Sequence, residues 1–355
     1  MMTQTTPTTA APVVPMGTMR AAVVTEFGAP LQISQIDVPT PGCGEALVKV
    51  EASGVCHTDL HAAHGDWPVK PHLPFVPGHE GCGTVVAVGD GVVDLNVGDK
   101  VGNAWLWSAC GRCEYCRTGR ETLCEKQING GYTVNGSFAT YMLVNADYAP
   151  RIPQLADPLE VAPVLCAGVT VYKGLKVADA RPGQWMAISG IGGLGHIAVQ
   201  YARAMGLRVV AVDVDDAKLT LATQLGAEVV VNAATHDVVG QVQEATGGVH
   251  GVLVTAVHPQ AFGQAIGLAR RGATIVFLGL PPGDFPAPVF GIVIEGLTIR
   301  GSIVGTRQDM AEALDFYARG LIRPTVSTTR LEDINNVFDR MEHGQIEGRI
   351  VIDYR

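Results

Sequence analysis

The sequence predicts an α/β protein with two domains, a β-rich domain followed by a doubly wound parallel sheet. Its 355 residues exceed the size of one ordinary domain. Residues 19–147 contain short apolar runs separated by Gly, Pro and Asp, which is typical of strands joined by turns. From about residue 182 strand-like and helix-like segments alternate, which indicates a parallel sheet covered by helices on both faces.

The N-terminal end differs in composition from the rest of the chain. Its first 20 residues are rich in Thr, Pro and Ala and lack the charged start and apolar run of a signal peptide. We expect residues 1–18 to form a flexible extension and the folded part to begin near Met19. In the β-rich region that follows, three segments have the clearest strand pattern: Ala46–Glu51, Thr84–Val88 and Phe138–Val144.

The second half opens with a buried strand at Gln184–Ser189, followed by a glycine cluster. A helix then places Leu194, Ile197 and Tyr201 on one apolar face and ends at Gly206. Further strands are expected at Leu207–Val212, Glu228–Val231, Gly251–Thr255 and Ala273–Gly279, with helices at Asp216–Leu225 and Ala261–Arg270. The last segments, helices near Asp309–Arg319 and Asp333–Glu342 and a strand at Arg349–Asp353, could complete either domain.

The net charge and the hydropathy of the sequence limit which classes of partner the protein is expected to bind. The net charge of −9 argues against nucleic acid or an anionic membrane as the main partner, because both require basic surface. The sequence contains no run of about 18 or more apolar residues, so no transmembrane helix is expected. We therefore expect a cytoplasmic protein, in which the eight cysteines are reduced and metal binding is favoured over disulfides.

Four of the cysteines lie close together in the sequence. Cys110, Cys113, Cys116 and Cys124 fall within 15 residues, among Gly111, Arg112 and Gly119. Four thiolates on a tight loop match tetrahedral Zn²⁺ and leave no open coordination position, so this zinc is expected to be structural. Ligand type alone also allows an iron–sulfur cluster.

Three separate segments carry further soft ligands, at Cys56, His79 and Cys166. Two cysteines and one histidine with an open fourth position form a known catalytic zinc arrangement. The ligands are 23 and 87 residues apart, so only the fold can bring them together. Taken singly, Cys166 has the surroundings of a buried core residue and His79 those of a hydrogen-bonded turn residue.

The glycine cluster after the first strand of the second half has the pattern of a dinucleotide-binding loop. Gly190, Gly192, Gly193, Leu194 and Gly195 connect that strand to a helix, and Asp213 ends the next strand. The glycines allow the backbone to approach a pyrophosphate, whose charge the helix N-terminus favours. Asp213 can accept hydrogen bonds from a ribose 2′-hydroxyl and would repel a 2′-phosphate, so NAD is favoured over NADP.

Several motifs in this order carry a family resemblance. Cys56–Pro68, Gly78–Gly81, the four-cysteine segment and Val164–Lys173 together resemble the zinc-dependent medium-chain alcohol dehydrogenases. The most similar branch is that of the tetrameric ethanol dehydrogenases typical of yeast and bacteria. The resemblance runs from about Met19 to Arg355.

The resemblance implies an α/β fold with a GroES-like β-rich catalytic domain over residues 19–162, completed by residues 303–355, and a Rossmann NAD-binding domain over residues 163–302. By position, Cys56, His79 and Cys166 bind a catalytic zinc, and the four clustered cysteines bind a structural one. Asp59 resembles the carboxylate that hydrogen-bonds the zinc-binding imidazole. Glu80 corresponds to a residue that lies beneath the metal.

The resemblance also implies the reaction, the interconversion of short-chain primary alcohols such as ethanol and their aldehydes. A hydride passes from a zinc-bound alkoxide to NAD, and the proton leaves through Thr58 and His61. His57 and Arg349 resemble residues at the cofactor pyrophosphate, and Lys218 resembles one beside the adenosine ribose. Trp67 and Trp105 match positions that line a narrow substrate channel, and the branch implies a homotetramer.

Two other functions stay open from the sequence. The first is a related zinc dehydrogenase that acts on polyols, secondary alcohols or aromatic alcohols. Loops such as Trp105–Ser108 and Leu280–Asp284 depart from the yeast form, so the size of the pocket is not determined by the resemblance. The second is a non-catalytic family member that binds zinc.

Overall fold

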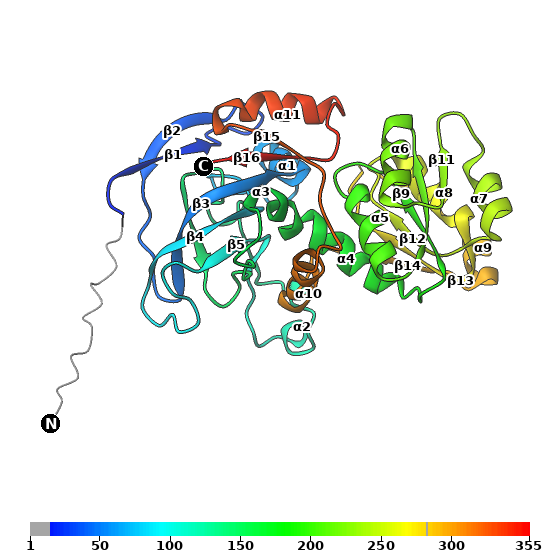
Figure 1. The fold of residues 1–355 in the computed structure, drawn as a ribbon, viewed down its shortest axis with the longest axis horizontal. Helices are drawn as coiled ribbons and strands as arrows, with labels where there is room; N and C mark the ends of the chain where they lie inside the picture. Colours follow the sequence, from blue (N-terminus) through cyan, green and yellow to red (C-terminus); the bar gives the residue numbers. More distant parts are fainter. Residues whose placement is uncertain (1–14, 282) are drawn as a thin grey trace.

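The computed structural model describes residues 15–281 and 283–355, which form two lobes (Figure 1). One lobe combines the N-terminal strands with the C-terminal segments, drawn in blue and red. The other lobe holds a parallel sheet and its helices, drawn in green and yellow. The predicted fold class is confirmed. Of the extension expected over residues 1–18, residues 1–14 lie outside the described part of the chain. The first strand already begins at Thr18.

Six parallel strands form the sheet of the second lobe, in the order β11–β10–β9–β12–β13–β14. Their bounds are β9 Trp185–Ser189, β10 Arg208–Asp213, β11 Val229–Asn232, β12 Val249–Val254, β13 Ala269–Phe277 and β14 Thr298–Gly301. The order of the strands reverses between β9 and β12. In open parallel sheets, ligands bind beyond the carboxyl ends of the strands at this point.

Side chains of this sheet alternate between two hydrophobic cores. Met186 and Ile188 of β9 pack with helices α4 and α5, whereas Ala187 between them packs with α8 on the other face. This alternation explains why the strands are apolar at every position, since both faces are covered. The helices of this lobe are α4 Ala167–Ala178, α5 Gly195–Ala204, α6 Asp216–Leu225, α7 Val238–Thr246, α8 Pro259–Leu268 and α9 Val289–Glu295.

The sequence pattern located most of these elements but missed helices α4, α7 and α9 and strand β14. Helix α4 starts with Ala-Gly-Val-Thr-Val, which has low intrinsic helix propensity, and is stabilised by burial instead. The predicted strand at Ala273–Gly279 starts earlier, at Ala269, because α8 already ends at Leu268. Pro259 at the first helical position begins α8 two residues before the predicted start.

A mixed sheet forms the core of the first lobe, in the order β15–β16–β3–β4–β5, with β8 also paired to β3. The bounds are β3 Glu45–Val55, β4 Gly81–Val88, β5 Lys100–Asn103, β8 Tyr141–Asn145, β15 Val326–Thr329 and β16 Arg349–Asp353. Two small antiparallel pairs lie beside it: β1 Thr18–Val23 with β2 Gln32–Asp37, and β6 Leu106–Ser108 with β7 Ile128–Asn129. Because β16 pairs with β3, the end of the chain lies next to residues 52–55. This pairing makes the C-terminal strand part of the first lobe.

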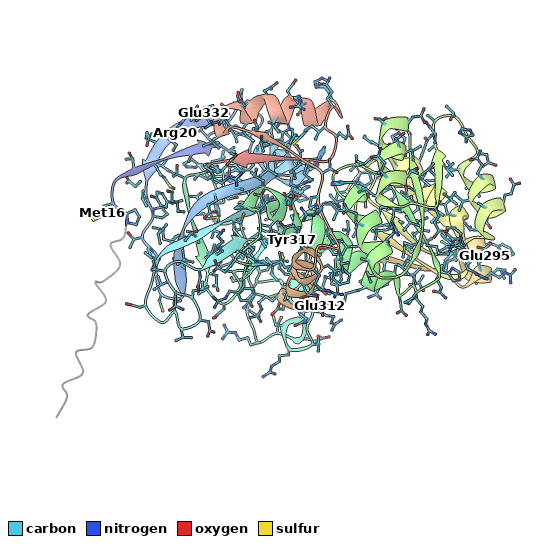
Figure 2. The ribbon with its side chains drawn as sticks, in the orientation of Figure 1. Met16, Arg20, Glu295, Glu312, Tyr317 and Glu332 are labelled. Carbon is cyan, nitrogen blue, oxygen red and sulfur yellow. The ribbon has the colours of Figure 1, made fainter. Side chains whose placement is uncertain are left out.

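The remaining helices are short or lie at the junction of the lobes: α1 His57–His64, α2 Glu114–Arg117, α3 Pro158–Val161, α10 Arg307–Ala318 and α11 Ile334–Glu342. Short 3-10 turns lie at Glu121–Leu123, Ala162–Leu165 and Leu331–Asp333. Helix α10 packs on α4, where Lys176 donates to Asp309 and Glu312. Figure 2 labels Glu312 and Tyr317 on α10, and the Tyr317 hydroxyl donates to Glu160.

No single helix in the described part of the chain has the length and apolar character of a membrane span. One bent helix pair, Pro158–Leu165 with Ala167–Ala178, meets the criterion by length and composition only.

Candidate functional site

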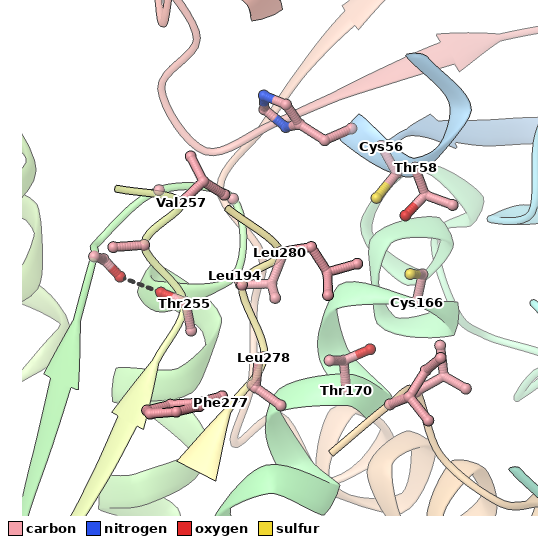
Figure 3. Close-up of a pocket in the computed structure, with 18 of the residues that line it drawn as sticks. Cys56, Thr58, Cys166, Thr170, Leu194, Thr255, Val257, Phe277, Leu278 and Leu280 are labelled. Atoms are coloured by element: carbon pink, nitrogen blue, oxygen red, sulfur yellow. Dashed lines mark hydrogen bonds between the residues drawn. The ribbon is translucent and has the colours of Figure 1, made fainter. Parts of the chain in front are cut away.

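A cavity of about 1850 Å³ lies between the two lobes. Cys56, Thr58 and Cys166 approach it from one side, and Leu278 and Leu280 from the other (Figure 3). Most residues singled out from the sequence line it: Cys56, His57, Thr58, His61, Trp67, His79, Trp105, Cys166, Gly190, Gly192, Gly193, Leu194, Asp213, Lys218 and Arg349. The fold therefore joins the scattered ligands and the glycine loop in one space.

Cys56, His79, Glu80 and Cys166 form what we call the buried donor cluster, with ligand atoms within 4.8 Å of one another. Pairing of β3 with β4 sets Ser53 opposite Gly81, so Cys56 and His79 lie side by side just beyond the paired residues. Cys166 stands at the start of α4, and its Sγ lies 3.1 Å from Nε2 of His79. The three ligands predicted from the sequence are thus brought together.

Asp59 holds the cluster in position, as the resemblance implied. Its carboxylate accepts the backbone N–H of Cys56 at 2.9 Å and that of Gly78 at 3.1 Å. The oxygen that accepts from Gly78, Oδ1, also accepts from Nδ1 of His79 at 2.8 Å, which leaves Nε2 free as a metal ligand. Although burial lowers the pKa of His79, the Asp59 carboxylate raises it above its ordinary value.

The donor set fits zinc by its chemistry. Two thiols and one imidazole, all buried, match a Cys₂His site with one open position. The hydrogen bond from Cys166 lowers the pKa of Cys56 well below its usual value, against the opposing effect of burial. A metal-ligating thiol needs this ionised form. Cys56, His79 and Cys166 would therefore hold the ion.

Behind these ligands lies a buried ion pair between Glu80 and Arg349. The two side chains are 0% and 4% exposed, and Nη2 of Arg349 donates to Oε1 of Glu80. Burial raises the pKa of Glu80 to about 7, although Arg349 opposes this. Among the described residues Oε2 of Glu80 and Nε of Arg349 have no hydrogen-bond partner. A Cβ at Gly54 would lie 1.9 Å from that oxygen, so glycine is required there.

Arg349 has a second neighbour on the cofactor side of the cavity. A Cβ added to Gly193 would lie 3.0 Å from Nη1 of Arg349. The guanidinium therefore lies between the buried donor cluster and the glycine loop. Its sequence-predicted role at the pyrophosphate stays a prediction, and its pairing with Glu80 is a contact that the sequence did not indicate.

The four clustered cysteines form a second group, on the loop around α2 that we call the four-cysteine lobe (residues 110–124). Sγ of Cys113 lies 3.5 Å from that of Cys116, and Cys110 lies 3.9 Å from Cys116. Tetrahedral zinc with bonds of about 2.3 Å sets its sulfurs roughly 3.8 Å apart, so the spacing fits. Backbone N–H groups of Arg112 and Cys113 lower the pKa of Cys110 to about 6.

The glycine loop after β9 has the geometry of a phosphate-binding turn. Gly190 has a φ of 94°, and a Cβ at Gly195 would lie 1.8 Å from the Gly190 carbonyl oxygen. Thr255 donates to that same oxygen at 2.6 Å (Figure 3). Gly195 therefore serves close packing within the loop, whereas Gly190, Gly192, Gly193 and Leu194 line the cavity.

Asp213, at the end of β10, is tied to this loop by its own hydrogen bonds. One carboxylate oxygen accepts the Ile191 N–H at 2.6 Å, and the other accepts those of Val214 and Asp215. The side chain is therefore fixed at the cavity edge. Lys218 on α6 lines the same cavity. The roles expected of these two residues at the adenosine ribose stay predictions.

Helix α1 carries the residues predicted for proton transfer. It begins directly after Cys56, so His57, Thr58 and His61 all lie on its first turns and line the cavity. Burial lowers the pKa of His57, which disfavours its charged form. The Nδ1 atom of His61 lies 2.8 Å from a carboxylate oxygen of Asp66, a contact that the sequence did not indicate.

Aromatic side chains narrow the cavity beside the buried donor cluster. The rings of Trp67 and Trp105 meet edge to face with centroids 5.9 Å apart, and the ring of Trp105 lies 5.6 Å from that of His79. Tyr132 packs against both indoles, at 5.5 and 5.3 Å, and was missed from the sequence. It follows a glycine-rich turn 27 residues beyond Trp105, and no local pattern distinguishes it from a packed core tyrosine.

Comparison with known proteins agrees with both halves of the site. Residues 42–154 match the alcohol dehydrogenase GroES-like domain, and residues 193–319 match the zinc-binding dehydrogenase domain. The chain is 62% identical to an alcohol dehydrogenase of Moraxella sp. (strain TAE123), over 95% of this chain and 99% of the relative. These matches favour zinc over an iron–sulfur cluster for the metal sites.

Solved structures give the same result. The alcohol dehydrogenase of Aeropyrum pernix superposes with a TM-score of 0.87 at 34% identity, over 94% of this chain and 99% of that one. The acetophenone reductase of Geotrichum candidum NBRC 4597, solved in complex with NAD, superposes with a TM-score of 0.85 at 32% identity. That match covers 96% of this chain and 98% of the reductase.

Proposed function

The chain belongs to the zinc-binding alcohol dehydrogenases with a GroES-like domain, and from this membership we propose that it interconverts short-chain primary alcohols and aldehydes with NAD. The observation that carries the proposal is the shared cavity. Cys56, His79 and Cys166 open into the same space as the glycine loop and Asp213. A substrate bound at the buried donor cluster would therefore face a dinucleotide bound at the loop.

The proposed reaction uses zinc and NAD together with side chains of the protein. When bound, zinc supplies a Lewis acid that lowers the pKa of an alcohol hydroxyl, and NAD supplies a hydride acceptor. Asp59 fixes the tautomer of His79, so that its Nε2 faces the cysteine thiols. The glycine loop and Arg349 provide N–H donors for phosphate oxygens at the junction of the lobes.

The chain also has to remove the proton that the alcohol loses. We assign this role to Thr58 and His61, three residues apart on α1 and both lining the cavity. Thr58 offers a hydroxyl that both donates and accepts, and His61 offers an imidazole nitrogen that can take up a proton. His61 is 33% exposed, so a proton taken up there can reach water.

The two indoles set the expected substrate size. Trp67 and Trp105, supported by Tyr132, occupy space beside the buried donor cluster that a long or branched alcohol would need. We therefore propose ethanol and similar primary alcohols as preferred substrates. Polyols, secondary alcohols and aromatic alcohols are the alternatives within the same chemistry.

A substrate panel tests the proposal. The zinc-loaded protein is assayed for NADH formation with ethanol, butanol, 2-propanol and benzyl alcohol, and kcat/KM values are compared. We expect the highest value for ethanol or butanol. A higher value for 2-propanol or benzyl alcohol would replace the proposed substrate class. Absence of NADH formation with every alcohol would favour the non-catalytic alternative.

The cofactor preference makes a separate prediction at Asp213. Asp213→Asn keeps an oxygen that can accept the Ile191 N–H but removes the negative charge that repels a 2′-phosphate. The ratio of kcat/KM with NAD to that with NADP should fall about tenfold or more, since unit charges a few ångströms apart interact by more than about 1 kcal/mol. Asp237→Asn, at the start of α7, removes a carboxylate far along the chain and serves as control. An unchanged ratio in Asp213→Asn contradicts this role.

We also propose that copies of this chain associate, as expected of a homotetramer, and that the enzyme works in the cytoplasm. Helix α9 exposes Val289, Phe290, Val293 and Ile294, which are 53–80% exposed. It is followed in the chain by β14, the edge strand of the parallel sheet. Exposed apolar patches and open sheet edges are typical of surfaces that bind another chain. Sedimentation equilibrium of the native protein measures the number of copies.

A further inference from the structure

The turn after α1 folds back on the helix and brings Asp66 beside His61. Helix α1 ends at His64 and is capped by Gly65, which has a φ of 68°. The Asp66 N–H donates to the His61 carbonyl at 3.2 Å. A Cβ on Gly65 would lie 2.9 Å from the Phe27 ring, so both the conformation and the space require glycine. The resulting turn sets the Asp66 carboxylate 2.8 Å from Nδ1 of His61.

This contact determines which nitrogen of His61 carries the hydrogen. An ionised carboxylate only accepts hydrogen bonds, so Nδ1 is the donor. In the neutral ring the lone pair then lies on Nε2, which is the nitrogen left to take up a proton. The ring is also flanked by Trp67, with centroids 5.8 Å apart. His61 is therefore oriented by two neighbours from the same turn.

The exposure of His61 and Asp66 indicates whether their contact should affect folding stability or proton transfer. The side chains of His61 and Asp66 are 33% and 45% exposed, and both line the cavity. An exposed pair of this kind adds little to the stability of the fold. Its consequence should lie in proton transfer rather than in folding.

We propose that Asp66 is a positioning residue for proton transfer, which it influences through His61. The inference rests on the proposed function of His61 as proton acceptor. In alcohol oxidation the proton released by the hydroxyl binds Nε2 of His61, and the Asp66 carboxylate stabilises the imidazolium that forms. The proton then passes from Nε2 to water, and the neutral ring is restored with its hydrogen on Nδ1.

The experiment measures the single-turnover rate of NADH formation with ethanol, which separates chemistry from product release. Asp66→Asn offers an amide that can donate to Nδ1 and so allows the wrong tautomer. We expect a rate about tenfold lower, a part of the usual contribution of a general base. Asp66→Glu, which keeps the carboxylate, should recover most of the loss. In a His61→Gln background, Asp66→Asn should change the rate less than about twofold, because the two residues act together.

Glu342→Gln is the matched control. Glu342, on α11, lies against His64, which belongs to α1 as His61 does. Glu342 is 45% exposed, as Asp66 is, so its substitution removes an equivalent charge. It should leave the rate unchanged. The NADH dissociation constant and thermal midpoint of Asp66→Asn should also stay at wild-type values.

The outcomes separate two failures. If His61→Gln is as fast as the wild type, the proposed function of His61 is wrong, and the role of Asp66 falls with it. If His61→Gln is slow but Asp66→Asn is not, or if the two effects multiply in the double variant, only the role of Asp66 is overturned. If Glu342→Gln lowers the rate as much as Asp66→Asn does, the loss comes from removing a negative charge near the cavity and not from the contact with His61. That result would also overturn the role of Asp66.

Discussion

Cys166→Ala should lower kcat/KM for ethanol by about a thousandfold, because the Lewis acid it helps to hold contributes several kcal/mol to the reaction. The zinc content should fall from two ions per chain toward one. Cys166 is 7% exposed and lies 3.1 Å from His79, so its thiol belongs to the buried donor cluster. The four-cysteine lobe contains no part of that cluster and should keep its ion. Metal analysis and steady-state kinetics measure both changes.

The matched control is Cys43→Ser. Cys43 is an exposed cysteine outside both metal groups, so its replacement should leave zinc content and rate unchanged. If Cys166→Ala keeps two zinc ions and its activity, the assignment of Cys166 is wrong. If it loses both ions, the two sites are not independent.

Arg349→Met should lower the free energy of unfolding by about 3–5 kcal/mol, because it leaves the carboxylate of Glu80 buried and unpaired. The pair is 4% and 0% exposed, so the carboxylate of Glu80 has no solvent contact in the native protein. The double variant Arg349→Met with Glu80→Gln removes both charges and should recover a large part of the loss. Urea unfolding of the zinc-loaded protein gives the comparison.

A surface pair provides the reference for this prediction. Arg319 and Asp315 are each 61% exposed, so Arg319→Met should cost less than about 1 kcal/mol. A loss of similar size in both variants would show that burial of the Glu80 pair has no special effect. A double variant less stable than Arg349→Met alone would show that the unpaired charge is not the cause.

The two metal groups were predictable from the sequence to different degrees. The four-cysteine lobe follows from spacing, because ligands a few residues apart can meet on one loop whatever the rest of the fold. The buried donor cluster depends on the pairing of β3 with β4 and on the start of α4, a helix that the sequence pattern missed. The spacing of the ligands along the sequence indicates neither this strand pairing nor this helix. The family resemblance identified these ligands, and the structure brings them together.

Contacts across long sequence separations could not be predicted. Glu80 and Arg349 are 269 residues apart and meet because β16 pairs with β3. His196 is another case, since Nδ1 contacts the Gly192 carbonyl and Nε2 accepts the Thr325 N–H from the other lobe. Burial lowers the pKa of His196 to about 4, which keeps the ring neutral for this bridge. In the sequence it is one histidine on the apolar face of a helix.

The roles that the sequence did reveal belong to residues that are close together along the chain. Gly190, Gly195 and Asp213 belong to one strand–turn–helix–strand unit, in which each role follows from neighbouring residues. Asp66 is local too, five residues from His61, yet it was missed. Its signal was Gly65, a helix-ending glycine that turns the following residue back toward the helix. Helix ends beside a candidate base therefore carry information about its orientation.

Alcohol oxidation by this protein should depend on one of the two zinc ions that the chain holds. The direct test is a metal count per chain, combined with ethanol oxidation before and after selective removal of the more labile ion. We predict two zinc ions, loss of activity in step with one of them, and recovery when zinc is returned. One zinc per chain, or activity that persists after the ion at Cys56, His79 and Cys166 is gone, would contradict the account.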